Sequence, residues 1–155
     1  MRNNIKQIYL SNKWTYDSIM GFRYDESDDN RKYYVYEWHT GTGKVFYVGK
    51  GTGKRYEHIL KEIEAYKNNP RKYKGKNYKV LQDAYGIEHT IIMSDLTECE
   101  ALIMENYYII KFLSERQPLL NHIIPCVDDD LEQFWYDVNY SGELIEYFKP
   151  KESSN

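Results

Sequence analysis

Cysteine is scarce in this chain, and it contains no long apolar run. The 155 residues include two cysteines, Cys99 and Cys126, which lie far apart and form no CxxC pair. Neither a disulfide framework nor a structural zinc site is therefore expected. No stretch approaches the ~18 consecutive apolar residues of a membrane span, and residues 1–10 lack the apolar core of a signal peptide. We expect a protein that is neither secreted nor inserted in a membrane, located in the cytoplasm or, in a eukaryote, in the nucleus.

The chain also lacks the sequence motifs of two common kinds of site. Its four histidines show no HxxxH or HxH spacing, so they indicate no metal cluster. The glycine-rich stretch 47–55, YVGKGTGKR, does not fit the phosphate-binding loop GxxxxGKS/T, because Arg55 follows Lys54 and the glycines are wrongly spaced. A P-loop ATPase is therefore disfavoured.

Charge, in contrast, is plentiful and unevenly distributed. Residues 44–79 contain eleven basic and three acidic side chains, a net charge of +8, although the whole chain carries −3. From residue 80 onward, four basic residues face 15 acidic ones, a net charge of −11. Phosphate affinity depends on local cations, so the basic stretch is the part expected to face nucleic acid. A solvated basic loop is the alternative interpretation of this stretch.

Tyrosines are interspersed among the cations of the basic stretch. The chain has 17 tyrosines, and Tyr56, Tyr66, Tyr73 and Tyr78 lie between its basic residues. Aromatic rings among cations are suited to stacking on bases. The side chains expected to contact nucleic acid are Lys54, Arg71, Lys72, Lys74, Lys76 and Lys79.

The residue patterns predict three strands and several helices. Strands are expected at 33–38, 44–48 and 87–93, the first two joined as a hairpin and the second followed by a glycine-rich break. Helices are expected at 54–67, 77–85, 98–113 and 130–140. Thr97 and Glu100 form a capping-box pattern before the helix at 98–113. We expect one domain at 33–124, an N-terminal extension at 1–32 and a helical C-terminal extension at 125–155.

Glu105 stands out on the helix predicted at 98–113. The residues one turn away from it are largely apolar, namely Ala101, Leu102, Tyr108 and Ile109. A carboxylate in such surroundings must be paired, hydrogen-bonded, metal-bound or protonated, because an unpaired buried charge is costly. A structural salt bridge and a metal site are both open on this pattern.

The glycine-rich turn carries cations into the start of the helix predicted at 54–67. Lys50 lies within the turn, Arg55 opens the helix, and His58 follows one turn later on the same face. Such a turn is suited to holding a phosphodiester. Ordinary surface charge is the alternative interpretation of Lys50 and Arg55.

Five motifs follow one another along the chain, namely Tyr34-Val35-Tyr36, Tyr47-Val48-Gly49, Arg55 with His58, Glu105, and Pro118-Leu119-Leu120-Asn121. Together they resemble the GIY-YIG nucleases, in that family's order and approximate spacing. The match covers residues 33–121, and YVGKGTGKR is especially similar to the branch with a GKGxGxR turn. Tyr34 and Val35 depart from the usual Gly and Ile, at strand positions where the change concerns packing more than chemistry.

The resemblance implies an α/β (α+β) fold with a small central three-stranded antiparallel sheet flanked by helices. It also implies a metal-dependent endonuclease that hydrolyses phosphodiester bonds in double-stranded or branched DNA with one Mg²⁺ or Mn²⁺ ion. Glu105 would be the metal ligand, and Tyr47 the general base, with Tyr36 hydrogen-bonded beside it. A single acidic ligand fits one ion, since a two-metal site usually needs several carboxylates.

The other family positions would support Tyr47. Lys50 and Arg55 would lower its pKa, and Arg55 would also hold the phosphoryl oxygens as charge builds. His58 would assist proton transfer or orient a water. Asn121 would hydrogen-bond to position the site or the scissile strand.

Two other functions remain open for the same sequence. A non-catalytic nucleic-acid-binding module would keep the basic stretch, and Tyr36 and Tyr47 would then be a cross-strand packing pair. A protein-interaction domain would use the acidic C-terminal half. No separate recognition domain is visible, so specificity is expected to be low or to come from the termini, a homodimer or a partner.

Overall fold

The computed structural model describes residues 2–12, 23–73 and 86–140 of the chain. Its elements in chain order are α1 (Arg2–Ser11), β1 (Tyr33–Thr40), β2 (Val45–Gly51), the 3₁₀ turn η1 (Arg55–Glu57), α3 (His58–Asn68), the 3₁₀ turn η2 (Pro70–Tyr73), β3 (Ile87–Leu96), α5 (Glu98–Ser114) and α6 (Asp129–Tyr140). The helix predicted at 54–67 thus begins as η1 and continues as α3. The helix predicted at 77–85 lies outside the described residues.

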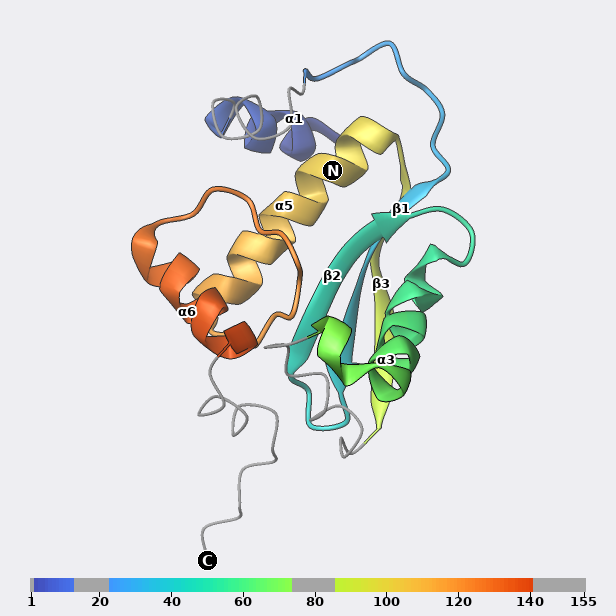
Figure 1. The fold of residues 1–155 in the computed structure, drawn as a ribbon. Coiled ribbons are helices and arrows are strands. Elements are labelled where there is room, and N and C mark those ends of the chain that lie inside the picture. The colour runs from blue at the N-terminus through green and yellow to red at the C-terminus, as the bar shows by residue number, and fades with distance from the viewer. Residues whose placement is uncertain (1, 13–22, 74–85, 141–155) are drawn as a thin grey trace, which may run out of the picture.

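The three strands form one antiparallel sheet in the order β2-β1-β3 (Figure 1). β1 and β2 are the predicted hairpin, whose turn is closed by the N–H of Thr40, which donates to the carbonyl of Lys44 at 2.9 Å. Gly43 has a φ of +87° in this turn, a conformation that favours glycine. With helices beside this sheet the fold is α+β, and the predicted fold class is confirmed.

The β2 strand is longer than its sequence pattern predicts. It continues through the glycine-rich stretch, so that Tyr36 pairs with Gly49 and Tyr34 with Gly51. Glycine weakens a strand, which is why the pattern predicts a break after residue 48. Here each glycine instead admits a close side chain, Tyr36 at Gly49 and Arg55 at Gly51.

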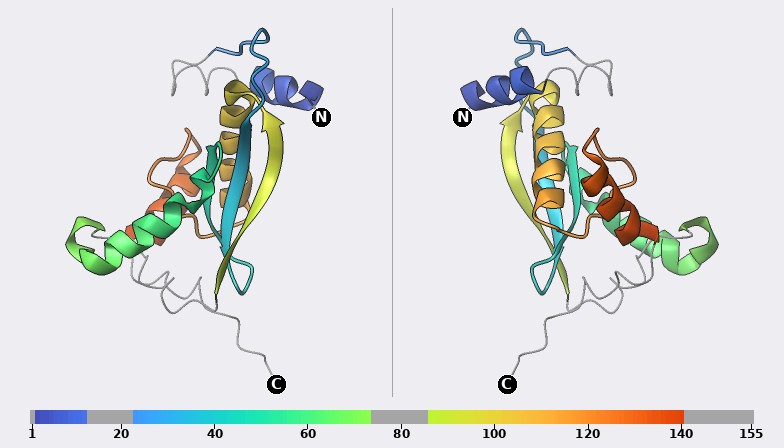
Figure 2. Two further views of the ribbon diagram at one scale, coloured as in Figure 1. Left: turned by 90° about the vertical axis from the view of Figure 1, so that its right-hand side faces the viewer. Right: turned by 90° about the vertical axis from the view of Figure 1, so that its left-hand side faces the viewer.

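Helices cover both faces of the sheet. Figure 2 shows α3 in front of the sheet in one view and α5 in front of it in the opposite view. One apolar core joins the sheet, α5 and α1, and it includes Val35, Val48, Ile103, Ile5 and Tyr9. A second core joins the sheet and α3, and it includes Tyr36, Trp38, Phe46, Ile59 and Ile63. The candidate site residues on β1 and β2 therefore stand on a strand pair that is packed from both sides.

The start of α5 is fixed by the predicted capping box. The N–H of Glu100 donates to Oγ1 of Thr97 at 3.1 Å, and the N–H of Thr97 donates to Oε1 of Glu100 at 3.0 Å. Glu100 is buried, and its carboxylate also forms an ion pair with Arg31. The capping box is confirmed, and it sets the residue at which the helix carrying Glu105 begins.

The segment between α5 and α6 covers the free edge of β2. The N–H of Val45 donates to the side-chain oxygen of Gln117 at 3.0 Å, and the N–H of Leu120 donates to the carbonyl of Phe46 at 2.7 Å. Covering an edge strand in this way satisfies its backbone groups and blocks pairing with another chain.

The helix predicted at 130–140 is present as α6, and it holds this covering segment in place. Nε1 of Trp135 donates to the carbonyl of Asn121 at 2.8 Å, and Nδ2 of Asn139 donates to the carbonyl of Leu119 at 3.0 Å. Both acceptors belong to the segment that lies along β2. Helix α6 is therefore connected to the sheet through its hydrogen bonds to this segment.

The two cysteines are free thiols, with Cys99 buried and Cys126 exposed. None of the helices in the described part of the chain combines the length and the apolar character needed to cross a bilayer.

Candidate active site

Two phenols meet on the β1–β2 ladder. Tyr36 is 1% exposed and lies opposite Gly49, where an added Cβ would be 2.5 Å from the Tyr36 Oη. Glycine at this position therefore leaves room for the ring. The centroids of the Tyr36 and Tyr47 rings are 6.1 Å apart, and the two side chains are hydrogen-bonded. The structure thus brings together the predicted general base and its predicted partner.

Burial raises the pKa of both phenols. The pKa of Tyr47 rises to about 12, first because of burial and then because of the nearby carboxylates of Glu62 and Glu105. Arg55 and the hydrogen bond from Tyr36 act in the opposite direction without outweighing burial. The pKa of Tyr36 is also raised, again mainly by burial. Arg55 thus lowers the pKa of Tyr47, as the sequence predicts for this cation, but burial has the larger effect and the net pKa is raised.

Arg55 is held against the backbone of β2 by a tight turn. A Cβ at Gly51 would lie 2.3 Å from the Cβ and Cγ of Arg55, so the glycine admits the arginine. The hydroxyl of Tyr34 accepts from the N–H of Tyr56 at 2.9 Å and donates to the carbonyl of Gly53 at 2.9 Å. Tyr34 stands where the GIY-YIG pattern has glycine, and its phenol closes the turn that places Arg55.

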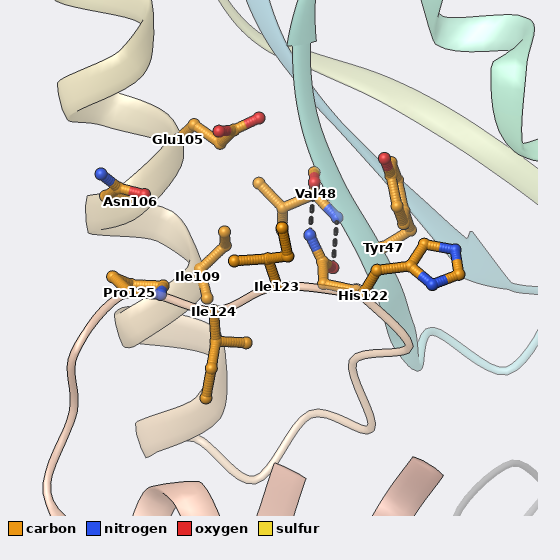
Figure 3. Close-up of a pocket in the computed structure, with 10 residues that line it drawn as sticks. Tyr47, Val48, Glu105, Asn106, Ile109, His122, Ile123, Ile124 and Pro125 are labelled. Atoms are coloured by element: carbon orange, nitrogen blue, oxygen red, sulfur yellow. Dashed lines mark hydrogen bonds between the residues drawn. The ribbon is translucent and has the colours of Figure 1, made fainter. Parts of the chain in front are cut away.

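Glu105 is a largely buried carboxylate on the face of α5 that looks toward β2 (Figure 3). It forms no ion pair with any residue that the structure describes. Burial raises its pKa to about 7, against the charge and backbone hydrogen bond of Lys50 and the charge of Arg55. Lys50 itself pairs with Glu98 at 3.8 Å and lies over the ring of Tyr33. Among the described residues Glu105 therefore has no partner for the structural salt bridge that the sequence left open.

The side chain of Asn121 forms two hydrogen bonds with the backbone of β2, at the residue that follows Tyr47. Its Nδ2 donates to the carbonyl of Val48 at 2.8 Å, and its Oδ1 accepts from the N–H of Val48 at 3.1 Å (Figure 3). The amide thus satisfies both backbone groups of one residue, as a neighbouring strand would. Asn121 is 6% exposed, and both of its hydrogen bonds hold the backbone of β2.

His58 belongs to a cluster of three side chains beside Tyr47. Its Nε2 lies 3.0 Å from Oε1 of Glu62, and Nε2 of His122 lies 3.1 Å from Oε2 of the same carboxylate. Glu62 is close enough to Tyr47 to raise its pKa. Sequence reasoning missed Glu62 and His122, although Glu62 follows His58 by one helical turn and His122 adjoins Asn121.

The predicted nucleic-acid contacts lie around α3 and beyond it. Lys54 and Arg71 are exposed, at the two ends of the helical segment. Lys72 lies in η2 next to Arg71. Lys74, Lys76 and Lys79 lie outside the described residues.

The carboxylate of Glu105 suits the binding of one divalent cation that prefers oxygen ligands. Among the described residues, no group of three or more His, Cys, Asp or Glu side chains is placed to enclose a metal ion. Glu105 is instead a single carboxylate without an ion-pair partner there. Mg²⁺ is commonly held by one or two carboxylates and keeps several waters, so this donor fits one such ion.

Comparisons with protein-family models, curated proteins and solved structures find no match to this chain. The resemblance to the GIY-YIG nucleases therefore rests on the sequence motifs alone. The function has to be argued from the chemistry of the side chains around Tyr47 and Glu105.

Proposed function

We propose that this chain is an endonuclease that hydrolyses phosphodiester bonds in DNA with one divalent ion, Mg²⁺ or Mn²⁺. One observation carries the proposal: Glu105, a largely buried carboxylate without an ion-pair partner among the described residues, lines the same hollow as Tyr47. Such a carboxylate is costly to ionise, and a bound cation offsets that cost. The raised pKa of Glu105, about 7, fits a group that ionises when a metal binds.

Glu105 would hold the ion, with waters and phosphate oxygens as the other ligands. When bound, the ion supplies positive charge that neutralises a phosphate oxygen and the leaving 3′-oxygen and favours ionisation of the nearby phenol. Lys50 lies beside Glu105 and keeps part of the site cationic.

Tyr47 is the general base of the proposal: its phenol first loses its proton to solvent, and the ionised Oη then accepts a proton from the attacking water. Tyr36 donates a hydrogen bond to that oxygen and stabilises its ionised form. The charge of Arg55 acts on both phenols, and in the proposal this guanidinium stabilises the phosphoryl oxygens as they gain charge. His58, held by Glu62, transfers a proton or orients the water.

DNA would reach this site along the basic stretch. Lys54 and Arg71 offer exposed cations on either side of α3, and Lys72, Lys74, Lys76 and Lys79 continue the same charged segment. Phosphate contacts of this kind set affinity and register without reading sequence. Double-stranded and branched DNA both fit such a surface.

The test is nicking of supercoiled plasmid with Mg²⁺, with a chelator, and with the variant Glu105→Gln. We expect cleavage that needs the metal and is lost in the variant by about a hundredfold or more. Circular dichroism and a DNA mobility shift of the variant should match the parent chain. Glu115→Gln, an exposed glutamate at the end of α5, is the matched control and should cleave normally. Full activity of Glu105→Gln would refute the metal assignment.

A non-catalytic DNA-binding module is the second candidate, and one observation favours it. A Tyr47 pKa near 12 keeps the phenol protonated at neutral pH in the chain by itself. A binding module predicts a mobility shift with no nicking under any metal. The plasmid experiment therefore decides between the two candidates.

A further inference from the structure

The hollow beside Glu105 is larger than a metal ion requires. It has a volume of about 280 Å³ and lies between α5, β2 and the segment that follows Asn121 (Figure 3). This size is at the small end of ligand pockets and would take one base-sized group. The hollow adjoins Tyr47 and Glu105, so it begins where the phosphodiester is proposed to be cut.

The wall of the hollow is apolar. Four residues line it, namely Ile109, which is 3% exposed, and Ile123, Ile124 and Pro125. Ile123 is 78% exposed, so core packing does not account for an isoleucine there. Exposed apolar side chains next to DNA-binding surfaces can insert between base steps and hold a base out of the stack.

A buried amide adds polar recognition to this wall. Asn106 is 7% exposed and lines the hollow, and its Nδ2 has no hydrogen-bond partner among the described residues. Leaving a buried donor unpaired is costly. A half-turn of the amide exchanges its Oδ1 and Nδ2, so Asn106 can offer either a donor or an acceptor to a ligand. A single group of this kind can pair with one donor or acceptor on the edge of a nucleobase.

We propose that this hollow receives the base of an unpaired nucleotide next to the scissile phosphate. The preferred substrate would then be DNA with an extrahelical or single-stranded nucleotide at the cleavage point, and this inference rests on the proposed nuclease function. A phosphate held through the ion at Glu105 would bring its own nucleoside to the rim of the hollow. A base in a regular duplex would first have to be unpaired and unstacked, whereas an unpaired base enters at little cost.

The experiment compares two labelled duplexes that differ only in one unpaired 2-aminopurine nucleotide at the cleavage site. The parent chain should cleave the duplex with the unpaired nucleotide about tenfold faster or more. Ile123→Ala and Asn106→Ala should reduce this preference, measured as the ratio of the two cleavage rates, to about threefold or less. Leu10→Ala removes an exposed apolar side chain from α1 and should keep the full preference.

Fluorescence separates the failure of this inference from the failure of the nuclease proposal. In the Glu105→Gln background, 2-aminopurine emission should rise on binding as the base leaves the stack, and adding Ile123→Ala should abolish the rise. Equal cleavage of both duplexes without a rise would overturn the pocket and leave the nuclease intact. A rise without any cleavage by the parent would keep the pocket and overturn the nuclease.

Discussion

The phenol of Tyr36 lies across the backbone of Gly49, its partner in the β1–β2 ladder. A Cβ at Gly49 would come within 2.5 Å of both Cζ and Oη of Tyr36, which is closer than real Cβ contacts come. The glycine of one motif is therefore required by the tyrosine of the other. This relationship gives the YVG triplet a steric reason that does not depend on any family.

We expect Gly49→Ala to displace Tyr36 and to impair both stability and activity. Overpacking of this kind costs about 1–3 kcal/mol in the free energy of unfolding, measured by urea denaturation. Plasmid nicking should fall in the same variant because Tyr36 no longer reaches Tyr47. Gly43→Asn is the control, since Gly43 has open space around it and asparagine tolerates its positive φ. Unfolding at the same urea concentration as the parent would contradict the steric argument.

The raised pKa of Glu105 makes stability depend on pH. Between its ordinary value of 4.5 and about 7, the folded chain binds a proton that the unfolded chain has released. The contribution of Glu105 to the free energy of unfolding therefore falls as pH rises through this window and is constant above it. Glu105→Gln should be more stable than the parent by on the order of 2–3 kcal/mol at pH 8, with little difference at pH 4.

Urea denaturation at several pH values, with chelator present, measures this effect. Glu115→Gln is the matched control on the same helix. A constant difference between Glu105→Gln and the parent across the whole range would show that the carboxylate is not destabilised by burial.

Arg55→Ala tests the guanidinium beside the phenols. Its charge acts on Tyr36, Tyr47 and Glu105, and loss of one positioned transition-state donor lowers turnover by ~10²–10³. Steady-state nicking should show this loss in kcat. Lys54→Ala removes the adjacent exposed cation and should change turnover by less than about threefold. A similarly modest effect of Arg55→Ala on turnover would indicate that Arg55 is an ordinary surface charge.

Asn121→Ala tests the clamp on β2. It leaves the N–H and the carbonyl of Val48 without their partners, and each unsatisfied buried group costs about 1–3 kcal/mol. We expect the free energy of unfolding to fall by about 2–4 kcal/mol, with activity falling as β2 loosens. Asn12→Ala removes a single partly buried hydrogen bond to Ile8 and should cost about 1 kcal/mol or less. Unchanged stability in Asn121→Ala would argue for a direct role in substrate contact.

Salt dependence tests the basic stretch. Replacing Lys72, Lys74 and Lys76 together by alanine should reduce the slope of log affinity against log salt by up to about 2.7, or 0.9 for each phosphate contact. The control replaces Lys6, Lys32 and Lys111, which lie outside this stretch and give the same change in net charge. If the slope changes only in the control, DNA binds to another face.

Local patterns predicted the elements whose signals lie within a few residues. The capping box of Thr97 and Glu100, the hairpin and the start of β3 all depend on neighbouring side chains. The direction of Glu105 toward the sheet also follows from helical spacing, because the apolar residues around it must pack inward. Such features depend on short-range physics and so appear in the sequence directly.

Features that depend on distant residues were not predictable in the same way. Glu62 and His122 are sixty positions apart, and their hydrogen bond exists only because α3 and the β2-covering segment meet. The length of β2 depends on Tyr36 filling the space over Gly49, which strand propensity does not contain. The net pKa of Tyr47 depends on its burial among several elements, which outweighs the lowering by Arg55 that the residue types predict.

The hydrogen bond from Trp135 to the carbonyl of Asn121 means that α6 helps to position the candidate site. Asn121 is hydrogen-bonded to Val48, which lies between Tyr47 and Gly49 in β2. A chain that ends before α6 would retain every motif residue but lose the hydrogen bonds from Trp135 and Asn139 that hold the segment containing Asn121. A shortened version of this chain should therefore retain the residues through Tyr140.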